Sequence, residues 1–236
     1  MKLALFGGTF DPVHLGHLAV AQAATERFGL DCVFFVPANV PPHKRGRSLT
    51  KFQHRFAMLA LATAEEQRFV PSLLEADSMQ PNYSIQTVHR LKASLDTSSK
   101  LYFLIGVDAF MEIGSWKQAV ELLSECDFVV ASRPGYALKD IVNALPEPLR
   151  PDDSALQGIG QKPGRAIQLS STAIHLLDNV NQPISSTQIR AAAHQSVEQL
   201  SQYVPRLVAE YIRKEHLYLE RETNGEKWVV GQFEEN

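Results

Sequence analysis

The stretch Gly7–His17 reads GGTFDPVHLGH, and it decides the fold prediction. It follows a short apolar run at residues 3–6, LALF, and leads into LGHLAVAQAATERF at residues 15–28. Two glycines after a strand let the backbone approach a ligand closely, and the N-terminus of a helix attracts anions. The stretch therefore predicts a phosphate-binding loop between a buried strand and a helix.

Two histidines, His14 and His17, distinguish this loop from the common Gly-rich phosphate motifs. They are three positions apart at the start of a helix, so they share one face of it. Imidazoles there could bind phosphate oxygens and stabilise the charge that shifts during phosphoryl transfer. Two alternatives stay open at this point: the pair could ligate a metal together with Asp11, or it could simply bond to nearby backbone.

Apolar runs alternate with helical patterns along the rest of the chain. Strands are expected at residues 2–6, 32–36, 69–74, 101–105, 128–131 and 174–177. Helices are expected at residues 15–28, 84–95, 116–123, 138–145, 186–193 and 204–216, and one more begins at Thr50 with a capping box to Gln53. This alternation predicts an α/β fold, a doubly wound, Rossmann-like parallel sheet with helices on both faces and a C-terminal helical segment.

The bulk composition fits one globular domain. With 236 residues, we expect a domain over residues 1–220 that includes a loop-rich insertion at 135–168 and a C-terminal helical part at 184–220, followed by a polar tail at 221–236. A net charge of −3 argues against nucleic acid as a partner, and no apolar run reaches the roughly 20 residues that span a membrane. Cys32 and Cys126 lie in apolar runs and are expected to be reduced thiols, which indicates a cytoplasmic protein.

A second motif, ISSTQIR at Ile184–Arg190, opens a predicted helix and places an arginine one turn into it. Another SST copy at residues 170–172 is followed by AIHLL and lacks the arginine. Hydroxyls, backbone N–H groups and a guanidinium around one anion favour the copy with the arginine as a phosphate site. Together, HLGH at 14–17 and ISSTQIR resemble the two signatures of the nucleotidylyltransferase superfamily.

Further segments are similar to nicotinate mononucleotide adenylyltransferases, and they occur in the family's order over roughly residues 1–219. They are Asn39 and PPHK at 41–44, YSIQT at 83–87, IGVD at 105–108 followed by Trp116, RPG at 133–135, and YVPRLVAEYIRKEHLY at 203–218. Gln86 stands where the family usually has Asp, and residues 135–168 match no family segment.

The resemblance implies adenylyl transfer from ATP to nicotinate mononucleotide, which gives deamido-NAD and pyrophosphate in NAD biosynthesis. Pantetheine-phosphate or nicotinamide mononucleotide adenylyltransferase is the alternative, and a non-catalytic nucleotide-binding protein is an alternative of another class. The acceptor phosphate is already anionic, so the reaction needs positioning and charge stabilisation rather than a protein nucleophile. Mg²⁺ bound mainly through ATP is the expected cofactor, with no metal site on the protein. A homo-oligomer is left open.

The resemblance also assigns site residues. The catalytic set is His17 on the α-phosphate, His14 beside it, and Arg190. The ATP-binding set is Gly7, Gly8, Thr9, Phe10, Gly106, Asp108, Arg133, Ser185, Ser186 and Thr187. The acceptor set is Asn39, Lys44, Ser84, Thr87, Trp116 and Lys117. Trp116 is expected to stack on the pyridine ring, although a tryptophan at helical spacing is also typical of a core. Backbone N–H groups around Thr87 and Lys117 are expected to recognise the ring carboxylate.

Overall fold

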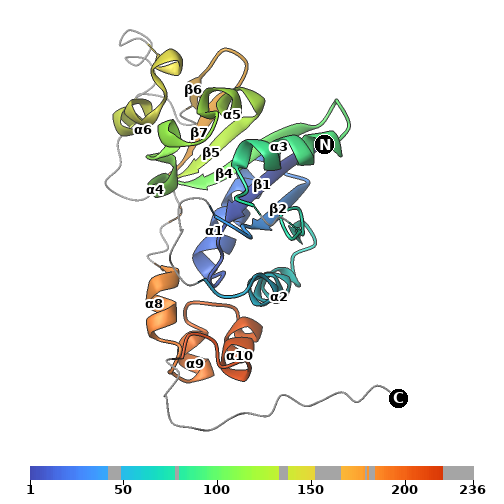
Figure 1. Ribbon diagram of the computed structural model, residues 1–236, viewed down its shortest axis with the longest axis vertical. Coiled ribbons are helices and arrows are strands. Elements are labelled where there is room, and N and C mark those ends of the chain that lie inside the picture. The colour runs from blue at the N-terminus through green and yellow to red at the C-terminus, as the bar shows by residue number, and fades with distance from the viewer. Residues whose placement is uncertain are drawn as a thin grey trace.

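A computed structural model of the protein describes residues 1–41, 49–77, 80–132, 138–151, 166–178, 180 and 184–219. Its centre is a seven-stranded sheet with the strand order β3-β2-β1-β4-β5-β7-β6 (Figure 1). The strands are β1 (Lys2–Gly8), β2 (Cys32–Pro37), β3 (Phe69–Pro71), β4 (Lys100–Gly106), β5 (Asp127–Ala131), β6 (Ala166–Gln168) and β7 (Ala173–Leu177). All neighbours pair in parallel except β6, which runs antiparallel to β7.

Helices cover both faces of this sheet, which confirms the predicted doubly wound α/β fold. The α-helices are α1 (Leu15–Phe28), α2 (Phe52–Thr63), α3 (Ser84–Ala93), α4 (Val107–Phe110), α5 (Ala119–Glu125), α6 (Leu138–Ala144), α8 (Ser186–Ala191), α9 (Val197–Leu200) and α10 (Arg206–Lys214). Two 3₁₀ helices, η2 (Ile113–Ser115) and η3 (Glu147–Leu149), lie between them.

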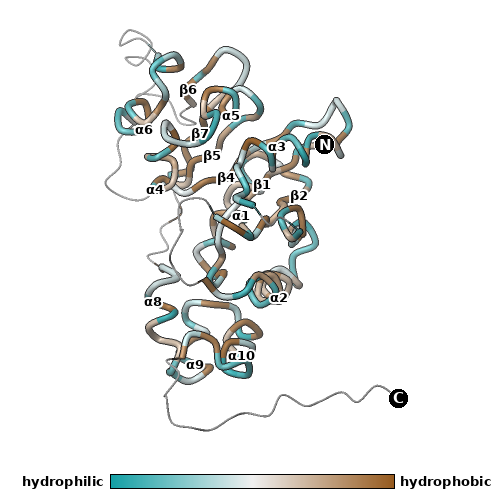
Figure 2. The backbone as a smooth tube through the Cα atoms, viewed as in Figure 1, coloured by the Kyte–Doolittle hydropathy of each residue, from teal (hydrophilic) through white to brown (hydrophobic). Residues whose placement is uncertain are grey.

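The alternation of side chains along β1 divides the core in two. Ala4 and Phe6 point into a cluster with α1, α2 and the C-terminal helices, whereas Leu3 and Leu5 point into a second cluster with α3, α4, α5 and α6. Successive strand residues face opposite sides of a sheet, so a strand buried on both faces is apolar throughout. Figure 2 shows this pattern as brown strands at the centre of the molecule.

The capping box predicted from Thr50 to Gln53 is wrong. Helix α2 begins at Phe52, after Lys51, and no side chain caps it. Instead, Thr50 contacts the loop of residues 7–17 with its backbone N–H, which donates to Asp11 Oδ2 at 3.3 Å, while its carbonyl accepts from Arg55 Nε of α2 at 2.8 Å. A tertiary contact therefore takes the place of the local cap.

The predicted helix at 116–123 begins only at Ala119. Gln118 has a left-handed backbone with φ 55°, and Trp116 has an extended one after η2. Trp116 is thus outside the helix, and its partly buried side chain packs against the second core cluster. The α-helices and strands that the sequence pattern did not predict, α4, α9 and β6, are all short, with 4, 4 and 3 residues.

The strand order reverses at β1, which pairs with β2 on one side and with β4 on the other. In doubly wound sheets, ligands bind beyond the carboxyl ends of the strands at this point. Here β1 ends at Gly7 and Gly8, and β4 ends at Gly106. Among the described helices, none is long and apolar enough to cross a membrane.

Candidate active site

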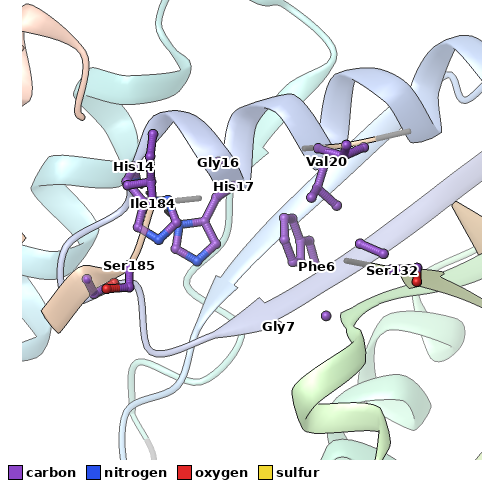
Figure 3. Close-up of a pocket in the computed structure, with 13 residues that line it drawn as sticks. Phe6, Gly7, His14, Gly16, His17, Val20, Ser132, Ile184 and Ser185 are labelled. Atoms are coloured by element: carbon purple, nitrogen blue, oxygen red, sulfur yellow. Dashed lines mark hydrogen bonds between the residues drawn. The ribbon is translucent and has the colours of Figure 1, made fainter. Parts of the chain in front are cut away.

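A cavity of about 280 Å³, here called the phosphate cavity, lies at this carboxyl edge. It joins the end of β1, the start of α1 and the segment before α8, and it is lined by Phe6, Gly7, His14, Gly16, His17, Val20, Gly106, Ala131, Ser132, Val180, Ile184, Ser185 and Ser186. Figure 3 shows the two imidazoles together at the start of α1, with Ser185 on the facing segment. The fold therefore brings the two sequence motifs, 170 residues apart, to one cavity.

The two histidine rings of this cavity stack with their centroids 3.7 Å apart and an interplanar angle of 28°. The backbone N–H of His14 donates to Nδ1 of His17 at 3.2 Å. Since Nδ1 accepts this bond, the neutral ring of His17 carries its proton on Nε2. The fold thus fixes His17 as an N–H donor at the mouth of a helix N-terminus, which suits an anionic oxygen.

The carboxylate of Asp11 is not shared with the two histidines. It is 3 % exposed, its Oδ1 accepts from the Tyr218 hydroxyl at 2.8 Å, and its Oδ2 accepts from the Thr50 N–H. In the described part of the chain, the one group of three residues with metal-ligand spacing is His89, Glu121 and Glu125 on α3 and α5. The geometry therefore favours the phosphate interpretation of His14 and His17 over metal ligation.

Helix α8 is bound to the phosphate loop through its first turn. Arg190 donates to the backbone carbonyl of Asp11 at 2.7 Å and to the Thr187 hydroxyl at 3.1 Å. The Ser186 hydroxyl donates to the carbonyl of Pro12 at 3.0 Å. Ser185 caps the helix in a capping box with Gln188. Arg190 and Thr187 are thus at the edge of the phosphate cavity rather than in its lining.

The second SST copy lies at the other edge of the sheet. Ser171 and Thr172 precede β7, and they line a separate cavity that includes Lys100 and Asp127. The Thr172 hydroxyl donates to the carbonyl of Leu123 at 2.6 Å. ISSTQIR, in contrast, follows β7 and so reaches the carboxyl edge.

A second cavity of about 360 Å³, here called the aromatic cavity, continues from the first. Its lining comes from the carboxyl ends of β1, β2 and β4 and from the segments around α3 and η2: Gly7, Gly8, Thr9, His17, Val36, Ala38, Pro41, Glu75, Asn82, Tyr83, Ser84, Phe103, Ile105, Gly106, Ala109, Trp116 and Lys117. Trp116 meets Phe103 edge to face, and Lys117 Nζ lies 4.2 Å from the centroid of the Tyr83 ring. An aromatic wall with one cation suits a flat heterocycle that carries an acid group.

Three residues, Gly7, His17 and Gly106, line both cavities. A ligand in one cavity and a ligand in the other would therefore meet beside the His17 ring. Phe10, which sequence analysis placed in the ATP set, is 1 % exposed and packs edge to face on His17 with centroids 5.0 Å apart. It supports the ring from the core rather than contacting a ligand.

The remaining predicted residues lie around the cavities or outside the described chain. Asp108 is exposed in the first turn of α4. Asn39 donates through Nδ2 to the carbonyl of Ala76 at 2.9 Å. Thr87 is 2 % exposed, and its hydroxyl donates to Glu75 Oε1 at 2.6 Å. Lys44 and Arg133 lie outside the described residues.

Sequence analysis missed Glu75 and Asn82 in the aromatic cavity and Arg55 beneath the phosphate loop. Glu75 and Asn82 follow β3, so the rule that loops after parallel strands share one edge would have found them. Arg55 is 1 % exposed and donates to the carbonyls of Thr9 and Thr50. Burial lowers the pKa of Arg55, and the negative charge of Asp11 opposes that shift. No local pattern marks an arginine that supports a distant loop.

Comparison with known proteins identifies the class that this fold and site define. The Cytidylyltransferase-like family matches residues 5–192, which is most of the chain. A solved structure of Plasmodium falciparum nicotinic acid mononucleotide adenylyltransferase, complexed with NaAD, has the same fold, with a TM-score of 0.65, 18% identity, and coverage of 92% of this chain and 97% of that one. The protein is a nucleotidyltransferase of this family.

Two curated relatives narrow the class further. A protein of Desulfotalea psychrophila is 37% identical over 219 residues, which are 92% of this chain and 99% of the relative. A protein of Thermoanaerobacter sp. is 37% identical over 227 residues, 95% of this chain and 98% of the relative. Both carry the name "Probable nicotinate-nucleotide adenylyltransferase". The chain belongs to the nicotinate-nucleotide adenylyltransferases of the Cytidylyltransferase-like family.

Proposed function

We propose that the protein transfers the adenylyl group of ATP to nicotinate mononucleotide, which gives deamido-NAD and pyrophosphate. The observation that carries this proposal is the pair of cavities that meet at His17. Residues of both nucleotidyltransferase motifs line the phosphate cavity, which suits the triphosphate of ATP. The aromatic cavity holds Trp116 and Lys117 and suits a pyridine ring with an acid group.

The chemistry follows from where the reacting atoms would meet. An oxygen of the acceptor 5′-phosphate forms a bond to the α-phosphorus of ATP, the bond from that phosphorus to the bridging oxygen breaks, and pyrophosphate leaves with the electron pair. The attacking oxygen is already anionic, so no proton has to be removed first. His17 Nε2–H would donate to an α-phosphate oxygen. The ring of His17 is held in place by the stacked ring of His14 and by the hydrogen bond that Nδ1 of His17 accepts from the His14 backbone. Such a preorganised donor acts on charge that develops in the transition state.

A divalent metal is used generally in this family, and the proposal specifies Mg²⁺ held mainly by the triphosphate. The described lining of the phosphate cavity contains glycines, histidines and serines but no carboxylate, so it fits an ion that keeps phosphate and water ligands. When bound, such an ion neutralises phosphate charge and assists departure of pyrophosphate.

One assay tests the proposed function. The purified protein is incubated with ATP, Mg²⁺ and, in turn, nicotinate mononucleotide, nicotinamide mononucleotide or phosphopantetheine, and pyrophosphate is measured. The first acceptor is expected to give the highest kcat/KM. Preference for phosphopantetheine would indicate the related acceptor class, and no pyrophosphate with any acceptor would support a non-catalytic nucleotide-binding protein.

Two expectations from the sequence belong to this proposal, the single domain over residues 1–220 and the cytoplasmic location, and so does the oligomeric state that the sequence left open. Size-exclusion chromatography coupled to light scattering tests the last of these.

A further inference from the structure

Glu75 is a buried carboxyl group in the wall of the aromatic cavity. It is 8 % exposed and lines the cavity beside Asn82, Tyr83 and Trp116. Its Oε1 accepts the hydroxyl of Thr87 at 2.6 Å, whereas its Oε2 is buried without a hydrogen-bond partner among the described residues. A charged carboxylate with one unpartnered oxygen is costly to bury, because water no longer solvates it.

The cations around Glu75 are occupied elsewhere. Arg55, from α2, donates to the carbonyls of Thr9 and Thr50, and Arg90, from α3, lies 3.4 Å from the carbonyl of Leu74. In the described part of the chain, no lysine, arginine or histidine nitrogen forms an ion pair with Glu75. The carboxyl group therefore has no counter-ion in contact.

Burial raises the pKa of Glu75 above its usual range. The Thr87 hydroxyl, the Asn39 backbone and the more distant charges of Arg90 and Arg55 oppose this shift without cancelling it. The geometry and the direction of the shift agree that folding makes the carboxyl group of Glu75 harder to ionise.

The charge of this side chain matters for the choice of acceptor, and the inference rests on the proposed function. The two pyridine mononucleotides differ only in the ring substituent, which is a carboxylate in one and a carboxamide in the other. An ionised Glu75 would repel the ring carboxylate through a medium of low dielectric constant, and it would repel a neutral amide far less. We propose that Glu75 makes the preference for the acid over the amide depend on pH, because ionisation of its buried carboxyl group adds a negative charge to the cavity wall that opposes an anionic ring.

The test is the ratio of kcat/KM for nicotinate mononucleotide to kcat/KM for nicotinamide mononucleotide, measured from about pH 5.5 to about pH 9. Both acceptors carry the same 5′-phosphate and react with the same ATP, so titration of His14, His17 or the phosphate cancels in this ratio. In the wild type, the ratio is expected to fall by about tenfold or more as Glu75 ionises at high pH. In Glu75→Gln, which cannot ionise, it is expected to stay high and independent of pH.

A ratio independent of pH in the wild type would overturn the proposal, and so would an unchanged slope in Glu75→Gln. The wild-type profile alone decides the first point, even if the variant folds poorly. Absence of pyrophosphate with both mononucleotides would contradict the proposed function and the specificity role together. Pyrophosphate formation with a flat ratio would contradict only the role of Glu75.

Unfolding provides a readout that does not depend on activity. A carboxyl group with a raised pKa in the folded state costs stability as the pH rises above its unfolded pKa of about 4.3. As the pH rises, the free energy of unfolding of Glu75→Gln should therefore increase relative to that of the wild type. Below about pH 4, the difference between the two free energies should be constant.

The matched control is Glu66→Gln, which removes a half-buried carboxylate paired with Arg68 at 2.7 Å. The Arg68 hydrogen bonds lower the pKa of Glu66 to about 2. This variant should therefore lose stability as the pH rises, which is the opposite sign. The free energy of unfolding could also differ between Glu75→Gln and wild type by an amount that does not change with pH. That result would show that the pKa of Glu75 is not raised in the folded state, and it would overturn the proposal.

Discussion

The hydroxyl of Tyr218 donates a hydrogen bond to Oδ1 of Asp11 at 2.8 Å, across 207 positions of sequence. Burial raises the pKa of Tyr218 well above its usual range, and the negative charge of Asp11 adds to that shift, so the phenol keeps its proton and remains a donor. The bond ties the segment after α10 to the phosphate loop. The C-terminal part of the described chain thus helps to hold the loop that lines the phosphate cavity.

Tyr218→Phe removes that donor and leaves Asp11 Oδ1 buried without it. The free energy of unfolding should fall by about 1–3 kcal/mol, the scale of a buried acceptor left unpaired, and the KM for ATP should rise. Urea unfolding and steady-state kinetics measure the two effects, with Tyr203→Phe on the same C-terminal part as the matched control. Equal stability of Tyr218→Phe and wild type would show that the bond contributes nothing.

His17→Ala should reduce turnover by about 10²–10³-fold, the scale of removing one preorganised donor from a transition state. The KM values should change less, because the donor acts mainly on developing charge. His89→Ala is the control, since it removes an imidazole on the exposed side of α3. Near-normal turnover of His17→Ala would refute its assignment to the α-phosphate.

Trp116→Ala should raise the KM for the mononucleotide by about tenfold or more and leave the KM for ATP nearly unchanged, since loss of a ring contact costs on the order of 1–3 kcal/mol. Trp116 lines the aromatic cavity but is not in the lining of the phosphate cavity. Initial rates with each substrate varied in turn separate the two constants. Equal increases in both KM values would show that Trp116 is a packing residue rather than a stacking platform.

Arg190→Ala should weaken ATP binding by about tenfold or more, because it removes a charge-assisted donor at the phosphate cavity. Ser171→Ala, in the other SST copy at the opposite edge of the sheet, should leave the ATP constant unchanged. Isothermal titration with a non-hydrolysable ATP analogue measures both. The reverse result would mean that the copy at residues 170–172 is the phosphate site.

The pH dependence of stability has a structural source at Asp127, which lies at the start of β5. Burial alone would raise the pKa of Asp127, but Lys100 at 2.7 Å, His175 at 3.2 Å and the Ala173 N–H at 3.1 Å lower it below its usual value. A lowered pKa contributes stability above the unfolded value of about 3.9, and that stability is lost as the pH falls toward the folded pKa. Asp127→Asn should therefore be destabilised at neutral pH and approach the wild type in acid, as thermal unfolding at both pH values would show. A stability difference that is the same at both would contradict this account.

The sheet and its order of helices could be predicted because each core strand is a short apolar run and each long helix is periodic. Leu15–Phe28 has the bounds predicted for it, since Gly29 ends it in a left-handed conformation with φ 62°. The start of α2 could not be predicted, because the backbone N–H of Thr50 donates to the distant Asp11 and its side chain does not cap the helix. At such positions, tertiary contacts override the local helix propensity.

The residues of the candidate site likewise fall into those that the sequence predicts and those that it does not. The residues of the two motifs were visible because their spacing requires a loop between a strand and a helix. Glu75 could have been found from its place after β3, whereas Arg55 was not visible, because a buried cation beneath a distant loop is defined by its neighbours in space. Arg55 became apparent only once its bonds to Thr9 and Thr50 were known.

The position of His17 in the walls of both cavities has a consequence for the reaction cycle. The dinucleotide product would occupy the phosphate cavity with its adenylyl half and the aromatic cavity with its pyridine half. Gly7, His17 and Gly106 would then be covered on both sides by one molecule. Departure of pyrophosphate alone therefore leaves neither substrate a place to bind, and the site is reset for the next turnover only when the dinucleotide leaves.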